Sequence, residues 1–262
     1  MRLVSFEGGF GRVDGDLVVP MGDDLVLYLA GEPSREAAPI PVSRLQLVSP
    51  VPVPKKIVCV GLNYRDHALE TGQSVPAEPI LFAKYANSVI GPEAAIRLPK
   101  SAPERVDYEA ELAVVIGRPA SQVTVAGALE HVAGYTCAND VSARDLQTRS
   151  SQWMLGKAVD TFLPLGPCLA TAEEISDPQH LNVRCTVNGV VVQDSNTSEM
   201  IFGVAQLVSF VSQTITLETG DLIITGTPSG VGFTRKPPRF LRPGDRVTVG
   251  IGDLSNPVLG QS

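Results

Sequence analysis

The sequence predicts a mainly β or α+β fold, in which many short strands are joined by tight turns and a few short helices occur. The first observation behind this prediction is that the 262 residues include 24 glycines and 21 prolines, too many for a helical bundle. The second is that the apolar runs are short and bounded by turn residues, as strands are. The third is that few segments have a helical period, and residues 198–213 are the clearest of them.

The chain begins with a small strand-and-turn module, which we predict to span residues 1–50, and continues as one main domain over residues 51–262. Two short apolar runs near the N-terminus are separated by turns at Gly8-Gly9 and Asp14-Gly15. The sequence Pro-Val-Pro-Val-Pro at 50–54 predicts a stiff, extended connector between the two parts.

Three segments of the main domain predict strands. Residues 56–64, KIVCVGLNY, have the pattern of a buried strand, and residues 111–117, ELAVVIG, form an apolar β-branched run typical of an interior strand. Residues 183–194 predict a hairpin, because alternating apolar positions lead into Asn188-Gly189, the preferred two-residue turn.

The predicted helix at 198–213 is followed by further strands. Ser198 is placed to cap this helix, and Glu199 suits its first turn. Its apolar stripe consists of Ile201, Val204, Leu207, Val208 and Val211. After the helix, the sequences ETGD and RPGD each predict a Gly-Asp turn that leads into a strand.

Composition excludes several classes of protein. The formal net charge is −7 and no basic stretch occurs, which argues against a nucleic-acid partner. The N-terminus has no signal-peptide pattern, and no apolar run is long enough to cross a membrane. The cysteines stand at positions 59, 137, 168 and 185 without a CxxC pair, so neither a zinc site nor a disulfide framework is indicated. We therefore expect a cytoplasmic protein without membrane partners.

Three carboxylates predict a metal site. Glu109 and Glu111 stand two residues apart at the start of the apolar run, and residues i and i+2 of a strand face the same side. Two carboxylates on one face repel unless a positive charge lies between them, and Mg²⁺ or Mn²⁺ prefers such oxygen ligands. Asp140, after another strand-like run, is a candidate third ligand. The alternatives are a solvated strand face for the two glutamates and a simple turn at Asn139-Asp140.

Other polar side chains in apolar surroundings are candidates for catalysis. His67 and Glu70 share one face of a helical turn, and the carboxylate would fix the tautomer of the imidazole and raise its basicity. The alternative is an exposed His–Glu pair. Lys84 and Lys157 interrupt apolar stretches, and Lys157 is the better candidate because Gly156 beside it allows close backbone approach.

The glycine-rich segment 225–232, TGTPSGVG, offers backbone N–H groups that could hold a carboxylate. It has neither the GK[ST] ending of a phosphate-binding loop nor the GxGxxG spacing of a dinucleotide fold. Nucleotide binding is therefore disfavoured.

Six segments together resemble the fumarylacetoacetate hydrolase family, in the order in which that family has them. The resemblance covers about residues 55–252, and residues 1–48 are similar to the variable N-terminal segment of bacterial members. The segments are GLNYRDHALETG, PILFAKYANSVIGP, VDYEAELAVVIGR, AGYTCANDVSARDLQ, GKAVDTFLPLGP and GDLIITGTPSGVG.

The resemblance implies a mixed β-sandwich roll, an assembly into homodimers and a small keto-acid substrate. It implies Mg²⁺ or Mn²⁺ at Glu109, Glu111 and Asp140. It further implies that His67 and Glu70 form the catalytic dyad of a lid and that Lys157 is the active-site lysine. The positions that it implies on the substrate side are Arg144, Gln147 and Thr227.

The function expected first is hydrolysis of a C–C bond in a 2,4-diketo acid of the acylpyruvate or fumarylpyruvate type, through a metal-stabilised pyruvate enolate. In this hypothesis His67, held by Glu70, deprotonates water, and Lys157 stabilises the oxyanion. The alternatives are a decarboxylase of oxaloacetate-like acids, and an isomerase or hydratase of 2-hydroxy-dienoates in aromatic catabolism. A non-catalytic binding protein that does not depend on the metal is an alternative of another class.

Overall fold

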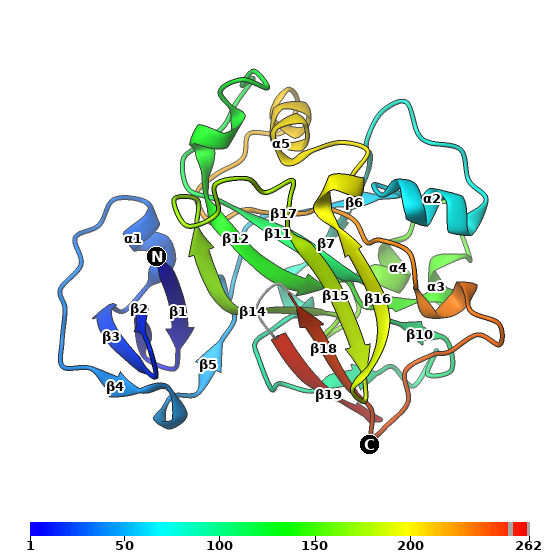
Figure 1. Cartoon of the computed structure of the whole chain (residues 1–262), viewed down its shortest axis with the longest axis horizontal. Helices are drawn as coiled ribbons and strands as arrows, with labels where there is room; N and C mark the ends of the chain where they lie inside the picture. The colour runs from blue at the N-terminus through cyan, green and yellow to red at the C-terminus, as the bar shows by residue number, and fades with distance from the viewer. Residues whose placement is uncertain (251–253, 261–262) are drawn as a thin grey trace.

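A large mixed sheet organises the chain in the computed structural model, which describes residues 1–250 and 254–260. Within those residues the large sheet has twelve strands, a second sheet has five and a third has two. Figure 1 shows the N-terminal strands at the left, and helix α5 at the top. The predicted mainly β fold with short helices is confirmed, while positions 251–253 and 261–262 of the predicted main domain lie outside the described residues.

The N-terminal strands form hairpins at the predicted turns. The elements are β1 (Arg2–Phe6), β2 (Gly9–Asp14), β3 (Leu17–Gly22), α1 (Leu25–Leu29), β4 (Ile40–Pro41), η1 (Val42–Arg44) and β5 (Leu47–Val48). Strand β1 pairs with β14 (Leu163–Thr171) of the main body, so the N-terminal strands continue the large sheet. The domain boundary at residue 50 remains a prediction.

The centre of the large sheet is β11 (Ala110–Ile116), whose seven residues are all buried. It pairs with β12 (Val132–Asn139) on one side and with β17 (Leu222–Ile224) on the other. Strand β17 runs parallel to β6 (Ile57–Gly61), which pairs with β7 (Ile80–Lys84). The two predicted buried strands, β6 and β11, are therefore both present in the large sheet, β11 in its interior and β6 next to the edge strand β7.

The five-stranded sheet packs against the large one. Its order is β16 (Val190–Asn196), β15 (Asn182–Val187), β18 (Arg246–Gly250), β19 (Leu254–Gly260) and β9 (Ile96–Leu98). The predicted hairpin is β15–β16, and both Asn188 and Gly189 have the positive φ that its two-residue turn requires. One apolar core contains Val183 and Val247 from this sheet together with Ala110 and Cys137 from the large one. The two sheets thus form a sandwich.

The predicted start of the helix at Ser198 is wrong. Helix α5 covers Val204–Ser212, and a separate turn, η4 (Thr197–Glu199), precedes it. The cause is tertiary, because Asn63 accepts the backbone N–H of Ile201 through its carbonyl and that of Phe202 through its side chain, which holds this segment out of the helix. The rest of the predicted stripe, from Val204 to Val211, is buried against the large sheet.

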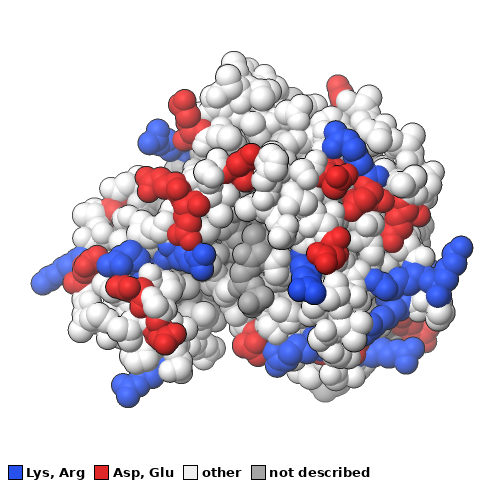
Figure 2. Space-filling view, in the orientation of Figure 1, with Lys and Arg blue, Asp and Glu red and all other residues white. Residues whose placement is uncertain are grey.

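The remaining elements are short. They are α2 (Arg65–Thr71), η2 (Ala86–Ser88), β8 (Val89–Ile90), β10 (Val106–Asp107), η3 (Ala128–His131), β13 (Ser142–Ala143), α3 (Arg144–Gln147), α4 (Met154–Lys157) and η5 (Gly232–Thr234). Within the described residues no helix has the length and hydropathy needed to cross a membrane. On the face that Figure 2 shows, acidic and basic side chains lie beside one another mainly at the left and at the right, and the upper part is mostly uncharged.

Candidate active site

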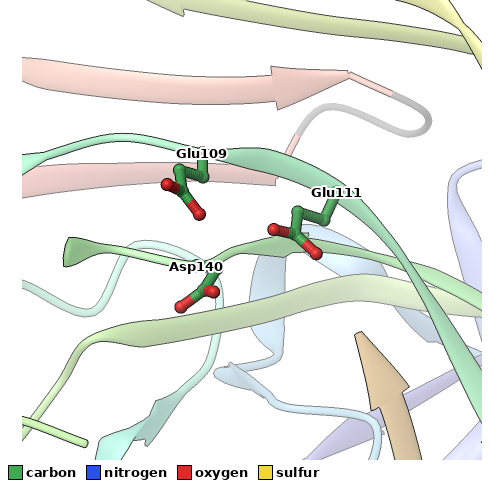
Figure 3. Close-up of side chains that lie close together, drawn as sticks. All are labelled: Glu109, Glu111 and Asp140. Carbon is green, nitrogen blue, oxygen red and sulfur yellow. The ribbon is translucent and has the colours of Figure 1, made fainter. Parts of the chain in front are cut away.

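Three carboxylates meet between the central strands. Glu109 immediately precedes β11, Glu111 is the second residue of that strand, and Asp140 follows the neighbouring strand β12. The backbone N–H of Asp140 donates to the carbonyl of Glu109 at 2.9 Å, which places the two residues side by side. One carboxylate oxygen from each residue lies within 4.8 Å of the other two (Figure 3). The expectation that the two glutamates share a face is confirmed, and Asp140 joins them.

Two lysines balance part of this buried negative charge. Lys157 Nζ lies 2.7 Å from Glu109 Oε2 and 2.7 Å from Asp140 Oδ2. Lys84 Nζ lies 2.6 Å from Asp140 Oδ1 and donates to the carbonyl oxygens of Val141 and Lys157. Both lysines are buried. Because a buried ammonium is stable only beside carboxylates or other acceptors, both lysines belong to the site.

Glu111 differs from the other two carboxylates. It is 1% exposed, accepts a hydrogen bond from the backbone N–H of Gly226, and has no ion pair within the described residues. Burial raises the pKa of Glu111 well above its usual value, and the neighbouring carboxylates of Asp140 and Glu109 raise it further. For Glu109, by contrast, the lysine and Arg144 outweigh the effect of burial and lower its pKa.

The donor set fits a hard divalent cation. Three buried carboxylates converge, all their donor atoms are oxygen, and the charge on one of them has no cationic partner in the part of the chain that the structure describes. Mg²⁺ and Mn²⁺ prefer such ligands. The three residues could therefore hold one of these ions, as the sequence predicts.

A cavity of about 440 Å³ opens beside the carboxylates. Most of the predicted site residues line it, namely His67, Glu109, Glu111, Arg144, Gln147, Lys157 and Thr227. Asp140 and Glu70 do not line it, but they contact Lys157 and His67, which do. The structure thus brings together the nine residues predicted for the metal, the dyad, the active-site lysine and the substrate.

The predicted dyad forms on helix α2. Nδ1 of His67 lies 3.2 Å from Oε2 of Glu70, and the other oxygen of Glu70 accepts hydrogen bonds from Thr234 Oγ1 at 2.7 Å and the backbone N–H of Gly230 at 3.0 Å. Burial would raise the pKa of Glu70, but these hydrogen bonds outweigh it and lower the pKa. Glu70 is therefore ionised at neutral pH and orients the imidazole.

A second carboxylate holds the start of the same helix. Asp66 accepts the backbone N–H of His67 at 2.8 Å through Oδ1. Its Oδ2 accepts the hydroxyls of Ser195 at 2.8 Å and Ser229 at 3.1 Å. The dyad is thus fixed to strand β16 and to the loop before η5.

Gly156 explains how Lys157 is positioned. A Cβ at this position would lie 2.6 Å from the backbone nitrogen of Gln147 and 2.7 Å from the carbonyl oxygen of Ala143. Only glycine therefore lets α4 approach α3 this closely. The expectation that Gly156 allows close backbone contact is confirmed, and Gln147 and Lys157 both line the cavity.

All three residues implied for the substrate are already engaged with protein groups. The Arg144 guanidinium lies 2.7 Å from Glu109 Oε1 and 2.9 Å from Asp107 Oδ2, and it also donates to Gln147 Oε1 at 3.0 Å. Thr227 donates its hydroxyl to the carbonyl of Ala110. In this arrangement Arg144 orients Glu109, while a substrate contact for these residues remains a prediction.

Two buried polar residues near the site are not predicted from the sequence. Asp107 is 0% exposed, and it accepts the N–H groups of Gly232 at 2.7 Å and Phe233 at 3.1 Å besides pairing with Arg144. Gln193 links β16 to the site by accepting the N–H of Ala110 and donating to Thr227. The signal for Asp107 is its place in the alternation of acidic residues at 107, 109 and 111. Gln193 has no local signal, because its partners are distant in sequence.

Comparisons of this sequence with known proteins agree on one family. The family model described as fumarylacetoacetate (FAA) hydrolase C-terminal matches residues 56–259. Over 222 residues the chain is 50% identical to a mitochondrial oxaloacetate tautomerase of Xenopus laevis, covering 83% of this chain and 69% of that protein. It is also 50% identical over 217 residues to a human mitochondrial oxaloacetate tautomerase, with 82% and 69% covered.

Solved structures share the whole fold. A putative HpcE protein from Mycobacterium smegmatis has a TM-score of 0.90 at 37% identity, and 100% of both chains is covered. A 2-hydroxyhepta-2,4-diene-1,7-dioate isomerase from Mycobacterium marinum has a TM-score of 0.86 at 37% identity, covering 100% of this chain and 99% of that one. The predicted sandwich type of fold is confirmed by this likeness.

Proposed function

The chain belongs to the fumarylacetoacetate hydrolase family, and on that premise we propose that it interconverts the keto and enol forms of a 2-oxo acid of the oxaloacetate type. The relatives named oxaloacetate tautomerase and the structural neighbour named isomerase support an isomerisation, the reaction class of one of the alternatives to the C–C hydrolysis expected first. Hydrolysis of acylpyruvates remains a prediction from the sequence.

The observation that carries the proposal is that a dyad base and a donor set for a divalent ion line one cavity. His67, Glu109 and Glu111 all line it, and Glu70 lies behind the imidazole as its partner. Tautomerisation needs a base at C3 of the acid and positive charge near the oxygen on C2. The cavity offers both.

A divalent ion held by Glu109, Glu111 and Asp140 would stabilise, as a Lewis acid, the negative charge that develops on the 2-oxo oxygen. Lys157, which lies 2.7 Å from both Glu109 and Asp140, adds a positive charge that lines the same cavity. Gln147 and Thr227 line the wall as further polar groups for the acid.

The proton transfer falls to His67. With Nδ1 donating to Glu70, Nε2 carries the lone pair and accepts the proton from C3, while the electrons of the C–H bond form the C2–C3 double bond. The enolate oxygen on C2 takes a proton from water, and the imidazolium gives its proton to the hydroxide that remains, which completes the enol and restores the base. In the reverse direction the imidazolium returns its proton to C3.

The test follows enol–keto conversion of oxaloacetate by its ultraviolet absorbance, with Mg²⁺ or Mn²⁺ present and the metal salt alone as the blank. We expect the wild-type protein to accelerate conversion and both His67→Asn and Glu111→Gln to lose most of the acceleration. Assays of pyruvate release from oxaloacetate and from acylpyruvates, run in parallel, separate tautomerisation from decarboxylation and hydrolysis. A wild-type rate no greater than that of the metal blank would overturn the proposal.

A further inference from the structure

Three strongly basic side chains line the cavity, and their surroundings differ. Lys157 pairs with Glu109 and Asp140, and Arg144 pairs with Asp107 and Glu109. Arg105 also lines the cavity, yet its guanidinium has no hydrogen bond or ion pair to any residue that the structure describes. One cation of the cavity is therefore free to bind a ligand.

We propose that Arg105 binds the distal carboxylate of the substrate and thereby selects 2-oxo acids that carry a second carboxylate. This inference rests on the proposed function, since it takes the 2-oxo acid end of the ligand to face the metal-site carboxylates. Guanidinium groups bind carboxylates through two parallel N–H···O bonds, which gives both affinity and orientation. A dicarboxylate of the oxaloacetate type has one charged group for each end of the cavity.

The position of Arg105 along the chain suits this role. It immediately precedes β10 and lies four residues before Glu109, a separation of at most about 13 Å between Cα atoms in extended chain. The side chain of Glu109 is buried, whereas Arg105 is exposed. Arg105 therefore lies at the outer part of the cavity, and the carboxylate cluster lies at the inner part.

The backbone around Arg105 is well fixed. Its carbonyl accepts the N–H of Arg144 at 2.9 Å, and the next residue, Val106, pairs with Ala143 on β13. The carbonyl of Val106 also accepts the N–H of Leu241 at 2.8 Å. The segment is thus held from both sides, so that the base of the Arg105 side chain has a defined place.

The side chain itself rests on an aromatic ring. The guanidinium carbon lies 5.5 Å from the centroid of Phe240, within the range of a cation–π contact. A ring contact holds the guanidinium in place without using its N–H donors. A carboxylate can then accept those donors with little further ordering of the side chain.

The chain offers a direct binding signal. Trp153 is its one tryptophan, and it lines the same cavity. Quenching of its fluorescence therefore measures ligand binding in the presence of Mg²⁺ without requiring turnover. Oxaloacetate and 2-oxobutyrate form a matched pair, because both have four carbons and only the first has a distal carboxylate. The longer dicarboxylate 2-oxoadipate covers the case of a longer natural substrate.

The variants are Arg105→Gln and Arg105→Lys. The first removes the positive charge, and the second keeps the charge but cannot form two parallel N–H···O bonds. Arg118→Gln is the control, since Arg118 is exposed just beyond the opposite end of β11 and does not line the cavity. We expect Arg105→Gln to weaken binding of at least one of the two dicarboxylates about tenfold to hundredfold and that of 2-oxobutyrate less than twofold. Arg105→Lys should fall between, and Arg118→Gln should change nothing.

Equal weakening of the monocarboxylate and the dicarboxylates by Arg105→Gln, or no weakening of either, would overturn the inference. Selective loss of dicarboxylate binding in a protein that does not accelerate tautomerisation would sustain the role of Arg105 and refute the proposed function. If wild-type protein and Arg105→Gln accelerate tautomerisation equally at limiting oxaloacetate, the role of Arg105 is refuted and the proposed function is not.

Discussion

A methyl group at position 156 would force apart the two short helices that carry Gln147 and Lys157. The Cβ of alanine would lie 2.6 Å from the backbone nitrogen of Gln147, and the carbonyl oxygen of Ala143 and the Cα of Gln147 are both 2.7 Å away. All three atoms belong to the backbone, so no side chain can rotate to relieve the contact. Lengthening the shortest contact to an ordinary 3.4 Å needs a shift of about 0.8 Å.

Two effects on stability oppose one another in Gly156→Ala. Overpacking of a buried contact costs about 1–3 kcal/mol, while alanine favours a helix over glycine by about 1 kcal/mol. We expect a net loss of about 1–2 kcal/mol in the free energy of unfolding. The effect on catalysis should be larger, because Lys157 holds two carboxylates at 2.7 Å and a misplacement near 1 Å costs about a hundredfold in rate.

Urea unfolding measures the first effect, and the rate of enol–keto conversion with Mg²⁺ measures the second. Gly127→Ala is the matched control, since its Cβ would meet only Thr124 Oγ1 at 3.7 Å. If Gly156→Ala unfolds at the same urea concentration as the control and keeps its rate, the packing of α4 on α3 does not position Lys157.

Three further predictions concern the carboxylates. Because the pKa of Glu111 is raised, the folded metal-free protein binds a proton there more readily than the unfolded chain, so stability falls as the pH rises above about 4.5. Glu111→Gln should therefore raise the Tm of metal-free protein at pH 7 and reduce the Tm gained from Mg²⁺; a lower metal-free Tm would contradict this. Glu70→Gln should lower the rate about tenfold to hundredfold at unchanged Mg²⁺ affinity in a titration. Since the pKa of Glu70 is lowered, its stabilising effect is present above pH about 4.5 and is lost at lower pH, where the Tm values of wild type and Glu70→Gln should converge. Asp107→Ala leaves Arg144 with one carboxylate and leaves the N–H groups of Gly232 and Phe233 without an acceptor. Urea unfolding should therefore show that the free energy of unfolding falls by about 3–5 kcal/mol. A fall below about 1 kcal/mol would contradict the structural role of Asp107.

Features that depend on local spacing could be predicted from the sequence. The i, i+2 spacing of Glu109 and Glu111 follows from strand geometry, and the i, i+3 contact of His67 with Glu70 follows from helix geometry. The β15–β16 hairpin followed from its Asn-Gly turn. In each case the partners lie within a few residues, so the local backbone alone brings them together.

Features that depend on partners distant in the sequence could not be predicted from it. The start of α5 is set by Asn63, about 140 residues away, and this contact overrides a local capping signal. From the sequence Lys84 is only a charge in an apolar run, because its partner Asp140 lies 56 residues further on, just after β12. Asp107 likewise gains its role from Gly232, 125 residues further on.

Several expectations remain predictions. These are the homodimer, the cytoplasmic location and the absence of nucleic-acid or membrane partners. Each depends on the surface of the protein or on a targeting signal, and not on how the core packs. The choice between Mg²⁺ and Mn²⁺ depends on small differences in ligand geometry at the three carboxylates.

Exchange of the C3 protons of oxaloacetate for deuterium, followed by proton NMR in D₂O with Mg²⁺, tests the central claim most directly. The account predicts that the wild-type protein accelerates exchange well above the rate with Mg²⁺ alone, that pyruvate does not accumulate in step, and that His67→Asn loses the acceleration. Exchange at the rate of the Mg²⁺ blank, or full acceleration by His67→Asn, would contradict it.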